Sequence, residues 1–470
     1  MRNSYIEEPT LQFGKGVHIC PRAGIGEHEV FDLDSNTRKA TINVGLVCSN
    51  NSLTAAREWF EKCSSFIKAK TSKQPKLFPS FCGFNEHVGF RSRMVADEQL
   101  TKGISNTAID DLFNERDRTT IISNAIDVFY GEIYELVQTK RPEVVVCVIP
   151  RIFEERVLKQ QEHLPDEALE EGLEEEVELD FRRALKAKSM GLGVPLQLIK
   201  ESNLRPNPRS QDDATKAWNF CTAIYYKANG IPWRLIRRED RLPTCYVGVA
   251  FYRSRDKESL HTSLAQMFDE LGRGVILRGM PVMIDKDDRK PHLRETQAHQ
   301  LLTDALEKYW QVMKNYPSRL VLHKTSSYTD NELEGFRQAV REKKIGAADY
   351  VTILDSPLRL FRDGLYPPVR GTCVDLGDRR YFICTRGSVP YYETYPGQYV
   401  PQPIEVRIFQ NDESPEVITA EILALTKMNW NNTQFDGKYP ITVGCARKVG
   451  QILKYLPESA PYQTRYSFYM

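Results

Sequence analysis

The first half of the chain alternates apolar, strand-like runs with amphipathic, helix-like segments. Runs of apolar residues with few interruptions predict strands, and apolar residues that recur every three or four positions predict helices. For the last helix of this half, Asp213 is the expected N-cap and Gly230 the expected C-terminal stop. The predicted elements, in chain order, are a strand over 39–49, a helix over 53–69, a strand over 143–150 and a helix over 212–230.

The second half begins with LPTCYVGVAFYRSR at residues 242–255, in which Tyr246 to Tyr252 form an apolar run broken only by Gly248. Such a run predicts a buried central strand. The patterns that follow predict a helix over 257–271, short strands in GVILRG and PVMID, a helix over 295–315, a strand over 318–327, a helix over 330–343 begun by a Thr329–Glu332 capping box, a hairpin around Gly377-Asp378, and helices over 415–428 and 441–456.

Strands that alternate with helices in both halves predict two α/β domains that meet near residue 240. A chain of 470 residues is also longer than one ordinary core requires. Ligands of such sheets bind at the carboxyl ends of strands. The residues after YVGVAFY and RLVLH are therefore the places where chemistry is expected.

The composition is that of a soluble, cytoplasmic protein. There is no stretch of about 18 apolar residues to span a membrane, and the start, MRNSYIEEPTLQFG, has no apolar core of a secretory signal. The 10 cysteines form no C-x-x-C pair, and several lie in apolar strand patterns. We therefore expect buried, reduced thiols and not disulfides or zinc ligands.

The charge is distributed unevenly along the chain. The formal net charge of +1 argues by itself against a nucleic-acid partner. However, residues 161–180 carry ten acidic residues and no lysine or arginine, whereas residues 181–250 carry thirteen basic residues against five acidic ones. Phosphate binding requires only a local basic face, which the sum over the chain does not report.

Basic and amide side chains follow the acidic run. Arg182 and Lys186 are four residues apart, so they share one face of a helix. Gln197 is expected to end the short strand that follows, and Lys227 lies on the predicted helix 212–230. Convergent side chains of these types hold a terminal phosphate through charge-assisted hydrogen bonds. From the spacing alone, a solvated basic helix face is the alternative interpretation.

Several of these segments resemble short prokaryotic Argonautes. LDFRRALKAKSMGLGVPLQLI and AWNFCTAIYYKANGIPWRL are similar to the MID domain, RLVLHKTSSYTDNELEGF and LTKMNWNNTQFDGKYPITVGCARKVGQILKYL to the PIWI domain, and PTLQFGKGVHICPRAGI to the segment that precedes MID. The resemblance implies an α/β fold in which a Rossmann-like parallel sheet is followed by an RNase H-like domain. The implied division is a lead-in segment (1–38), MID (39–240) and PIWI (241–470).

The resemblance also implies a MID pocket for the 5′-phosphate of a guide strand. Carried over by position, its ligands are Arg182, Lys186, Gln197 and Lys227, although Arg182 departs from the aromatic residue or histidine that is usual in the family. In many Argonautes the terminal carboxylate holds Mg²⁺ beside this phosphate, and here that residue is Met470. A frayed terminus is the alternative.

Slicing Argonautes hydrolyse the target with acidic residues that hold two magnesium ions. At three of these positions the sequence has Ala250, Lys324 and Arg447, which implies a catalytically inactive PIWI domain. The fourth position, a glutamate, cannot be aligned, and the acidic stretch MIDKDDRK is able to mislead a motif search. A guided nuclease is the alternative function.

The partners that the resemblance implies are a guide RNA, complementary single-stranded DNA of plasmids or phages, and a separately encoded APAZ-containing effector. A sirtuin-like or TIR effector would hydrolyse NAD after the heterodimer assembles into a higher oligomer, which causes abortive infection. An APAZ-linked nuclease is the alternative effector. A scaffold that binds no nucleic acid is a further alternative.

Overall fold

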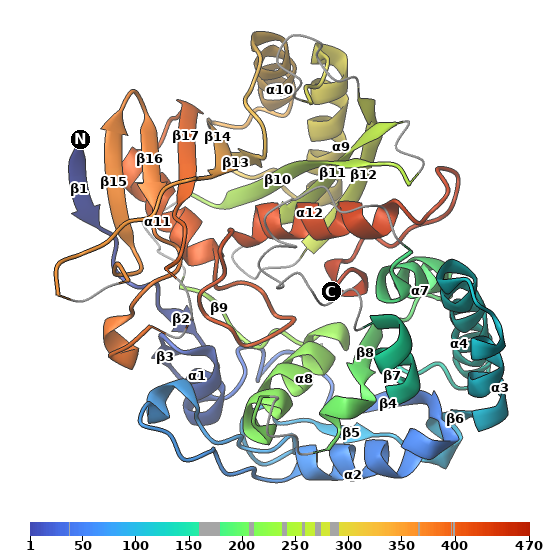
Figure 1. Ribbon diagram of the computed structural model, residues 1–470. Coiled ribbons are helices and arrows are strands. Elements are labelled where there is room, and N and C mark those ends of the chain that lie inside the picture. Colours follow the sequence, from blue (N-terminus) through green and yellow to red (C-terminus); the bar gives the residue numbers. More distant parts are fainter. Residues whose placement is uncertain are drawn as a thin grey trace.

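In the residues that it describes, the computed structural model has three β-sheets and the helices that cover them (Figure 1). It describes residues 1–36, 38–158, 179–205, 211–236, 242–255, 259–267, 274–282, 291–364, 367–395, 397 and 400–470. Within these ranges, no helix is both long enough and apolar enough to cross a membrane. Nine of the ten cysteines are buried, which confirms the predicted burial of these side chains.

A parallel sheet forms the core of the first half, with strands in the order β5-β4-β7-β8 and β6 also paired with β4. Every residue of β7 (Val144–Ile149) is buried, because alternate side chains enter two different apolar cores on the two faces of the sheet. The other elements are α1 (Pro21–His28), β4 (Thr41–Ser49), α2 (Leu53–Ser64), β5 (Arg93–Val95), β6 (Thr101–Ile104), α3 (Asn106–Asp111), α4 (Arg118–Lys140), α5 (Arg151–Phe153), α7 (Phe181–Ser189), β8 (Leu196–Lys200) and α8 (Asp213–Lys227).

A nine-stranded mixed sheet forms the second half, in the order β1-β15-β16-β17-β14-β13-β10-β11-β12. β10, β13 and β14 are parallel neighbours, and the other pairings are antiparallel. The elements are β1 (Arg2–Tyr5), β10 (Thr244–Arg253), β11 (Leu260–Met267), β12 (Gly274–Val282), α9 (Glu295–Met313), β13 (Arg319–Lys324), α10 (Asp330–Glu342), β14 (Ala347–Asp355), β15 (Thr372–Gly377), β16 (Arg380–Ile383), β17 (Ile404–Gln410), α11 (Pro415–Leu425) and α12 (Ile441–Leu453).

The predicted central strand, β10, is covered on both faces. Val247 and Val249 pack with residues of α9 and α10. Ala250 points to the other face, where it packs with Ala446 of α12. Gly248 lets α12 approach closely, since a Cβ atom there would lie 2.2 Å from the Thr442 carbonyl oxygen.

The predicted helix over 257–271 is wrong. Its described part is β11, which pairs antiparallel with β10. In this pairing Tyr246 is opposite Met267 at one end and Arg253 is opposite Leu260 at the other. Its leucines fit a helix in isolation, but without this strand the backbone groups along one edge of β10 would lack partners. GVILRG and the first two residues of PVMID likewise belong to one strand, β12, and the rest of PVMID lies outside the described residues.

Most of the other predicted elements are present within a few residues of their expected bounds, including the Thr329–Glu332 capping box of α10. Two details differ. Asp212, not Asp213, is the N-cap of α8, and its carboxylate accepts a hydrogen bond from the Thr215 backbone N–H at 3.1 Å. Gln197 is the second residue of β8 and does not end it.

The N-terminal segment contacts both halves. β1 pairs with β15, while β2 (Leu11–Gln12) and β3 (Val17–His18) form a small sheet with β9 (Arg234–Leu235). The division at residues 38 and 240 stays a prediction, and the second boundary lies outside the described residues.

Candidate functional site

Two lysines converge where α7, β8 and α8 meet. Lys227 ends α8 and is 1% exposed. Its Nζ donates to Gln197 Oε1 at 2.5 Å and to Asn431 Oδ1 at 3.5 Å. Lys186 lies on α7 and donates to the backbone oxygen of Met470. The structure therefore brings three of the predicted ligands to one place, which we call the lysine pocket.

Several basic groups gather in the lysine pocket. The pKa of Lys186 is lowered to about 7, first by burial and then by the charges of Arg182 and Lys448. The pKa of Lys227 is lowered well below its ordinary value, first by burial and then by Lys186. Because burial and neighbouring cations both disfavour the charged forms, a bound anion would stabilise them.

Arg182 is exposed at the start of α7, close enough to affect the pKa of Lys186. It therefore lies at the rim of the lysine pocket and not inside it. Asp180 caps this helix, with its carboxylate accepting from the Arg183 backbone N–H at 2.9 Å.

The end of the sequence is buried beside this pocket. Met470 is 5% exposed and packs with Tyr466, Phe468 and Tyr469 in the core that the two halves share. Figure 1 shows the chain ending beside α7. The alternative of a frayed terminus is therefore wrong.

Sequence reasoning missed two residues of this site, Lys448 and Asn431. Lys448 lies on α12 and influences Lys186, and Asn431 accepts from Lys227. Both belong to the quoted PIWI-like segment, but the spacing within that segment carries no information about an approach to α7 or α8. Lys448 does not stand out even within α12, because Arg447 and Gln451 are polar positions of the same helix.

Ala250 and Lys324 lie on neighbouring parallel strands, where Val249 of β10 is opposite Lys324. Lys324 is fully buried and forms an ion pair with Glu332 at 2.7 Å. Its Nζ also donates to the Ser327 backbone oxygen at 2.8 Å. Since Glu332 belongs to the capping box of α10, the Lys324 ammonium stabilises the start of that helix.

Arg447, the third position, extends from α12 towards the end of β14. Its guanidinium lies 4.2 Å from the centre of the Tyr439 ring and 3.6 Å from the Asp355 carboxylate. Lys438 also pairs with Asp355, at 3.0 Å. Two cations thus share one carboxylate at this strand end.

His323 precedes Lys324 and is fully buried. Its Nδ1 lies 2.8 Å from the Thr442 hydroxyl, and burial lowers its pKa to about 3. The imidazole is therefore neutral at physiological pH. In the part of the chain that the structure describes, no three histidine, cysteine or acidic side chains gather as a metal site. The stretch MIDKDDRK lies outside those residues.

The chain matches solved structures of Argonaute and Piwi proteins over nearly its whole length. Clostridium butyricum Argonaute bound to a guide DNA and a 19-mer target DNA has a TM-score of 0.70 and 15% identity, with 99% of this chain and 54% of that chain covered. Drosophila Piwi has a TM-score of 0.63 and 13% identity, with 99% of this chain and 56% of that chain covered. A. aeolicus Argonaute has a TM-score of 0.62 and 15% identity, with 99% of this chain and 55% of that chain covered.

The chain thus spans little more than half the length of these proteins. No protein-family model and no curated protein sequence matches it. The structural matches confirm the predicted fold class, a Rossmann-like parallel sheet followed by an RNase H-like domain, as in the MID and PIWI domains of Argonautes.

Proposed function

We propose, on its Argonaute-like fold, that this protein binds a short guide RNA and uses it to recognise complementary single-stranded DNA. The observation that carries the proposal is the lysine pocket, where the half-buried Lys186 and the buried Lys227 bring two amino groups together. The solved structure with a TM-score of 0.70 holds a guide DNA and a target DNA, which supports a nucleic-acid ligand of this general kind.

In this proposal, the guide 5′-phosphate accepts hydrogen bonds from Lys186, Lys227 and Gln197. Arg182 and Lys448 add positive charge from α7 and α12. A phosphate monoester carries nearly two negative charges at neutral pH, which matches the positive charge of two protonated lysines. The backbone oxygen of Met470 and the amide oxygen of Gln197 are of the donor type that Mg²⁺ prefers, so a magnesium ion fits beside the phosphate. Such an ion would supply further neutralising charge.

We further propose that the chain does not cut the target. Metal-dependent hydrolysis needs carboxylates that hold two ions. Ala250 and Lys324 supply none, and Arg447 brings a cation next to Asp355. Target recognition would then be reported to another protein.

The effector in this proposal is a separate APAZ-containing protein that forms a heterodimer with this chain in the cytoplasm. On target binding, the heterodimer assembles into a higher oligomer, and a sirtuin-like or TIR domain of the effector depletes NAD. The result is abortive-infection immunity against plasmids or phages. This part rests on the resemblance to short prokaryotic Argonautes. An APAZ-linked nuclease remains the alternative effector.

The first experiment compares binding of 5′-phosphorylated and 5′-hydroxyl RNA of one sequence. Removing a charge-assisted hydrogen bond costs about 1.5–3 kcal/mol, so Lys186→Ala and Lys227→Ala should each weaken the phosphorylated RNA by about tenfold or more. Lys188→Ala is the matched control, because Lys188 lies on the same helix but pairs with exposed Asp127. Equal binding of both RNAs by the wild-type protein would refute the proposed pocket.

A second experiment tests the absence of cleavage. The guide-loaded protein is incubated with complementary DNA and Mg²⁺ or Mn²⁺, and the DNA is resolved on a denaturing gel. Intact DNA is expected. Cleavage at one position opposite the guide, in a sample free of contaminating nuclease, would show instead that this chain is a guided nuclease.

A further inference from the structure

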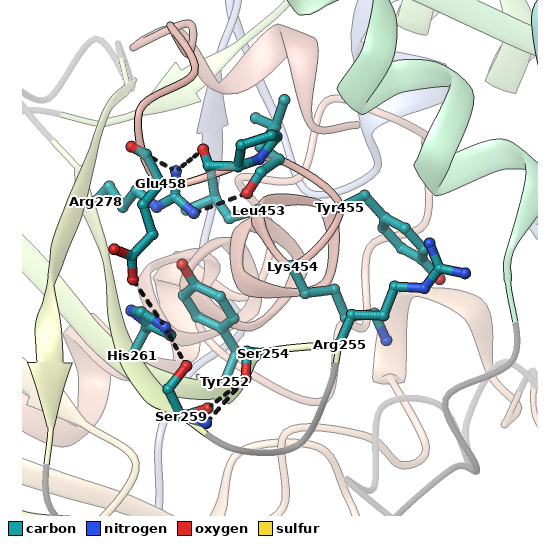
Figure 2. Close-up of a pocket in the computed structure, with 12 residues that line it drawn as sticks. Tyr252, Ser254, Arg255, Ser259, His261, Arg278, Leu453, Lys454, Tyr455 and Glu458 are labelled. Carbon is teal, nitrogen blue, oxygen red and sulfur yellow. Dashed lines mark hydrogen bonds and ion pairs between the residues drawn. The ribbon is translucent and has the colours of Figure 1, made fainter.

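A cavity of about 650 Å³ lies at the C-terminal end of α12, where that helix meets β10, β11 and β12 (Figure 2). We call it the α12 cavity. None of the four predicted phosphate ligands lines it. Its volume falls within the range of about 300–1,000 Å³ that is usual for small-molecule sites.

Hydrogen bonds hold the walls of the α12 cavity in place. Ser254 Oγ donates to the Ser259 backbone oxygen at 3.0 Å, which closes the β10–β11 hairpin. Ser259 Oγ lies 2.8 Å from His261 Nε2. On the opposite wall, the Arg278 guanidinium donates to the backbone oxygens of Leu456 and Pro457 at 3.0 and 2.9 Å, beyond the end of α12.

The charge around the α12 cavity is positive. Arg255, Arg278 and Lys454 line it, while Glu458 is the one carboxylate among the lining residues. The Glu458 side chain is 71% exposed and lies 3.5 Å from His261 at the rim. Three cations against one solvent-exposed carboxylate favour an anionic ligand.

One side of the α12 cavity is flat and aromatic. The Arg255 guanidinium lies 5.9 Å and the Lys454 ammonium 5.5 Å from the centre of the Tyr455 ring. Figure 2 shows the guanidinium beside this ring. Guanidinium planes and tyrosine rings are the surfaces on which proteins stack nucleobases.

Tyr252 supplies a polar group deeper in the same cavity. Its side chain is 8% exposed; burial raises the pKa of its hydroxyl, and the neighbouring Arg278 guanidinium opposes this rise. This hydroxyl can donate a hydrogen bond to a ligand atom or accept one from it.

The α12 cavity also adjoins the helix that carries Lys186. The Tyr455 hydroxyl accepts a hydrogen bond from the backbone N–H of Asp180 at 3.1 Å, and Asp180 caps α7. A ligand in the α12 cavity would therefore lie next to the element that, on the proposed function, holds the 5′ end of the guide.

We infer that the α12 cavity binds a nucleotide, with its phosphate between Arg255 and Lys454 and its base against the Arg255–Tyr455 surface. The nucleotide has two possible sources, which share this chemistry. It is either a free mononucleotide or an unpaired nucleotide of the target strand beyond the guide 5′ end. The second source rests on the proposed function, whereas the first does not.

The test uses full-length protein saturated with 5′-phosphorylated guide RNA, so that the lysine pocket is filled. In one arm, AMP and dAMP are titrated by calorimetry. In the other, target DNA that ends flush with the guide is compared with target that extends two nucleotides past the guide 5′ end. In at least one arm, binding of the nucleotide or the added affinity of the extension should fall about tenfold in Arg255→Ala/Lys454→Ala.

Two further variants separate binding from folding. Tyr455→Phe keeps the ring but loses the contact with Asp180, so it should bind the nucleotide, whereas Tyr455→Ala should not. Lys140→Ala, an exposed position at the end of α4 and far from the lining residues in sequence, is the charge control. Thermal unfolding of each variant identifies any that fail to fold.

The outcomes distinguish this inference from the proposed function. If guide and flush target bind but neither arm responds to Arg255→Ala/Lys454→Ala, the α12 cavity is no nucleotide site and the inference is wrong. If no guide binds, the proposed function is wrong. The AMP titration is then repeated with Lys186→Ala protein. If AMP binds this protein but not the same protein with Arg255→Ala/Lys454→Ala added, the α12 cavity is still a nucleotide site.

Discussion

Raising the pH from 7.5 to 8.5 should weaken the binding of 5′-phosphorylated RNA to the lysine pocket. The physical basis is Lys186, whose pKa burial and neighbouring cations lower to about 7. In the guide-free protein much of this lysine is therefore neutral near pH 8. A bound phosphate favours the charged form, so binding takes up a proton, and the affinity falls as the pH rises above 7.

The size of this effect follows from the pKa. With a pKa of about 7, about a quarter of Lys186 is protonated at pH 7.5 and about 3% at pH 8.5. The affinity should therefore fall about eightfold, equivalent to about 1.2 kcal/mol. The phosphate contributes little over this interval, because its second pKa is about 6. Lys227, whose pKa is also lowered, acts in the same direction.

Fluorescence anisotropy of labelled RNA between pH 6.5 and 9 measures this dependence. The 5′-hydroxyl form of the same RNA is the reference, since it shares every contact except the phosphate. Calorimetry in two buffers of different ionisation enthalpy reports the proton uptake directly. Lys188→Ala should keep the decrease of affinity with pH, and Lys186→Gln should make the affinity nearly independent of pH. Identical slopes for the two RNAs, or the absence of proton uptake, would refute the assignment of Lys186 as a phosphate ligand.

Three further predictions concern the fold around the two sites. Lys186→Met should raise the Tm of the guide-free protein by a few degrees while abolishing phosphate-dependent binding, because it removes a buried cation; an unchanged or lower Tm would contradict this. Glu332→Gln should lower the free energy of unfolding by about 3–5 kcal/mol, measured with urea, since it leaves Lys324 buried without its partner. The double variant Lys324→Met/Glu332→Gln removes the unpaired lysine, so it should recover much of the lost free energy of unfolding. Gly248→Ala should cost about 1–3 kcal/mol or more through its clash with Thr442, whereas Gly444→Ala, with open space at its Cβ position, should not.

Local patterns in the sequence predicted most of the elements that position the sites. The apolar run at 143–150 is β7, and the Thr329–Glu332 spacing is the capping box of α10. These features depend on residues a few positions apart, which is the range over which helical and strand periodicity act. The segment over 257–271 is the exception, because pairing with β10 overrides the local preference of its leucines.

The candidate ligands were recognisable only in part. Lys186, Gln197 and Lys227 followed from the resemblance, but Asn431 and Lys448 did not, because they come from a segment more than 200 residues further along the chain. The direction of Lys324 was also hidden from the sequence. The Lys324 side chain points towards α10, where it forms an ion pair with Glu332. Its charge therefore stabilises the fold and is not available at an open strand end.

By itself, the sequence determined the alternation of strands and helices, the buried thiols and the basic character of residues 181–250. The tertiary structure decided which distant groups meet: Met470 beside Lys186, Lys448 beside α7, and Tyr455 beside the cap of that helix. The physical reason is range. Periodicity records which face of an element is buried, whereas the meeting of two faces depends on how whole sheets and helices pack, which no local spacing encodes.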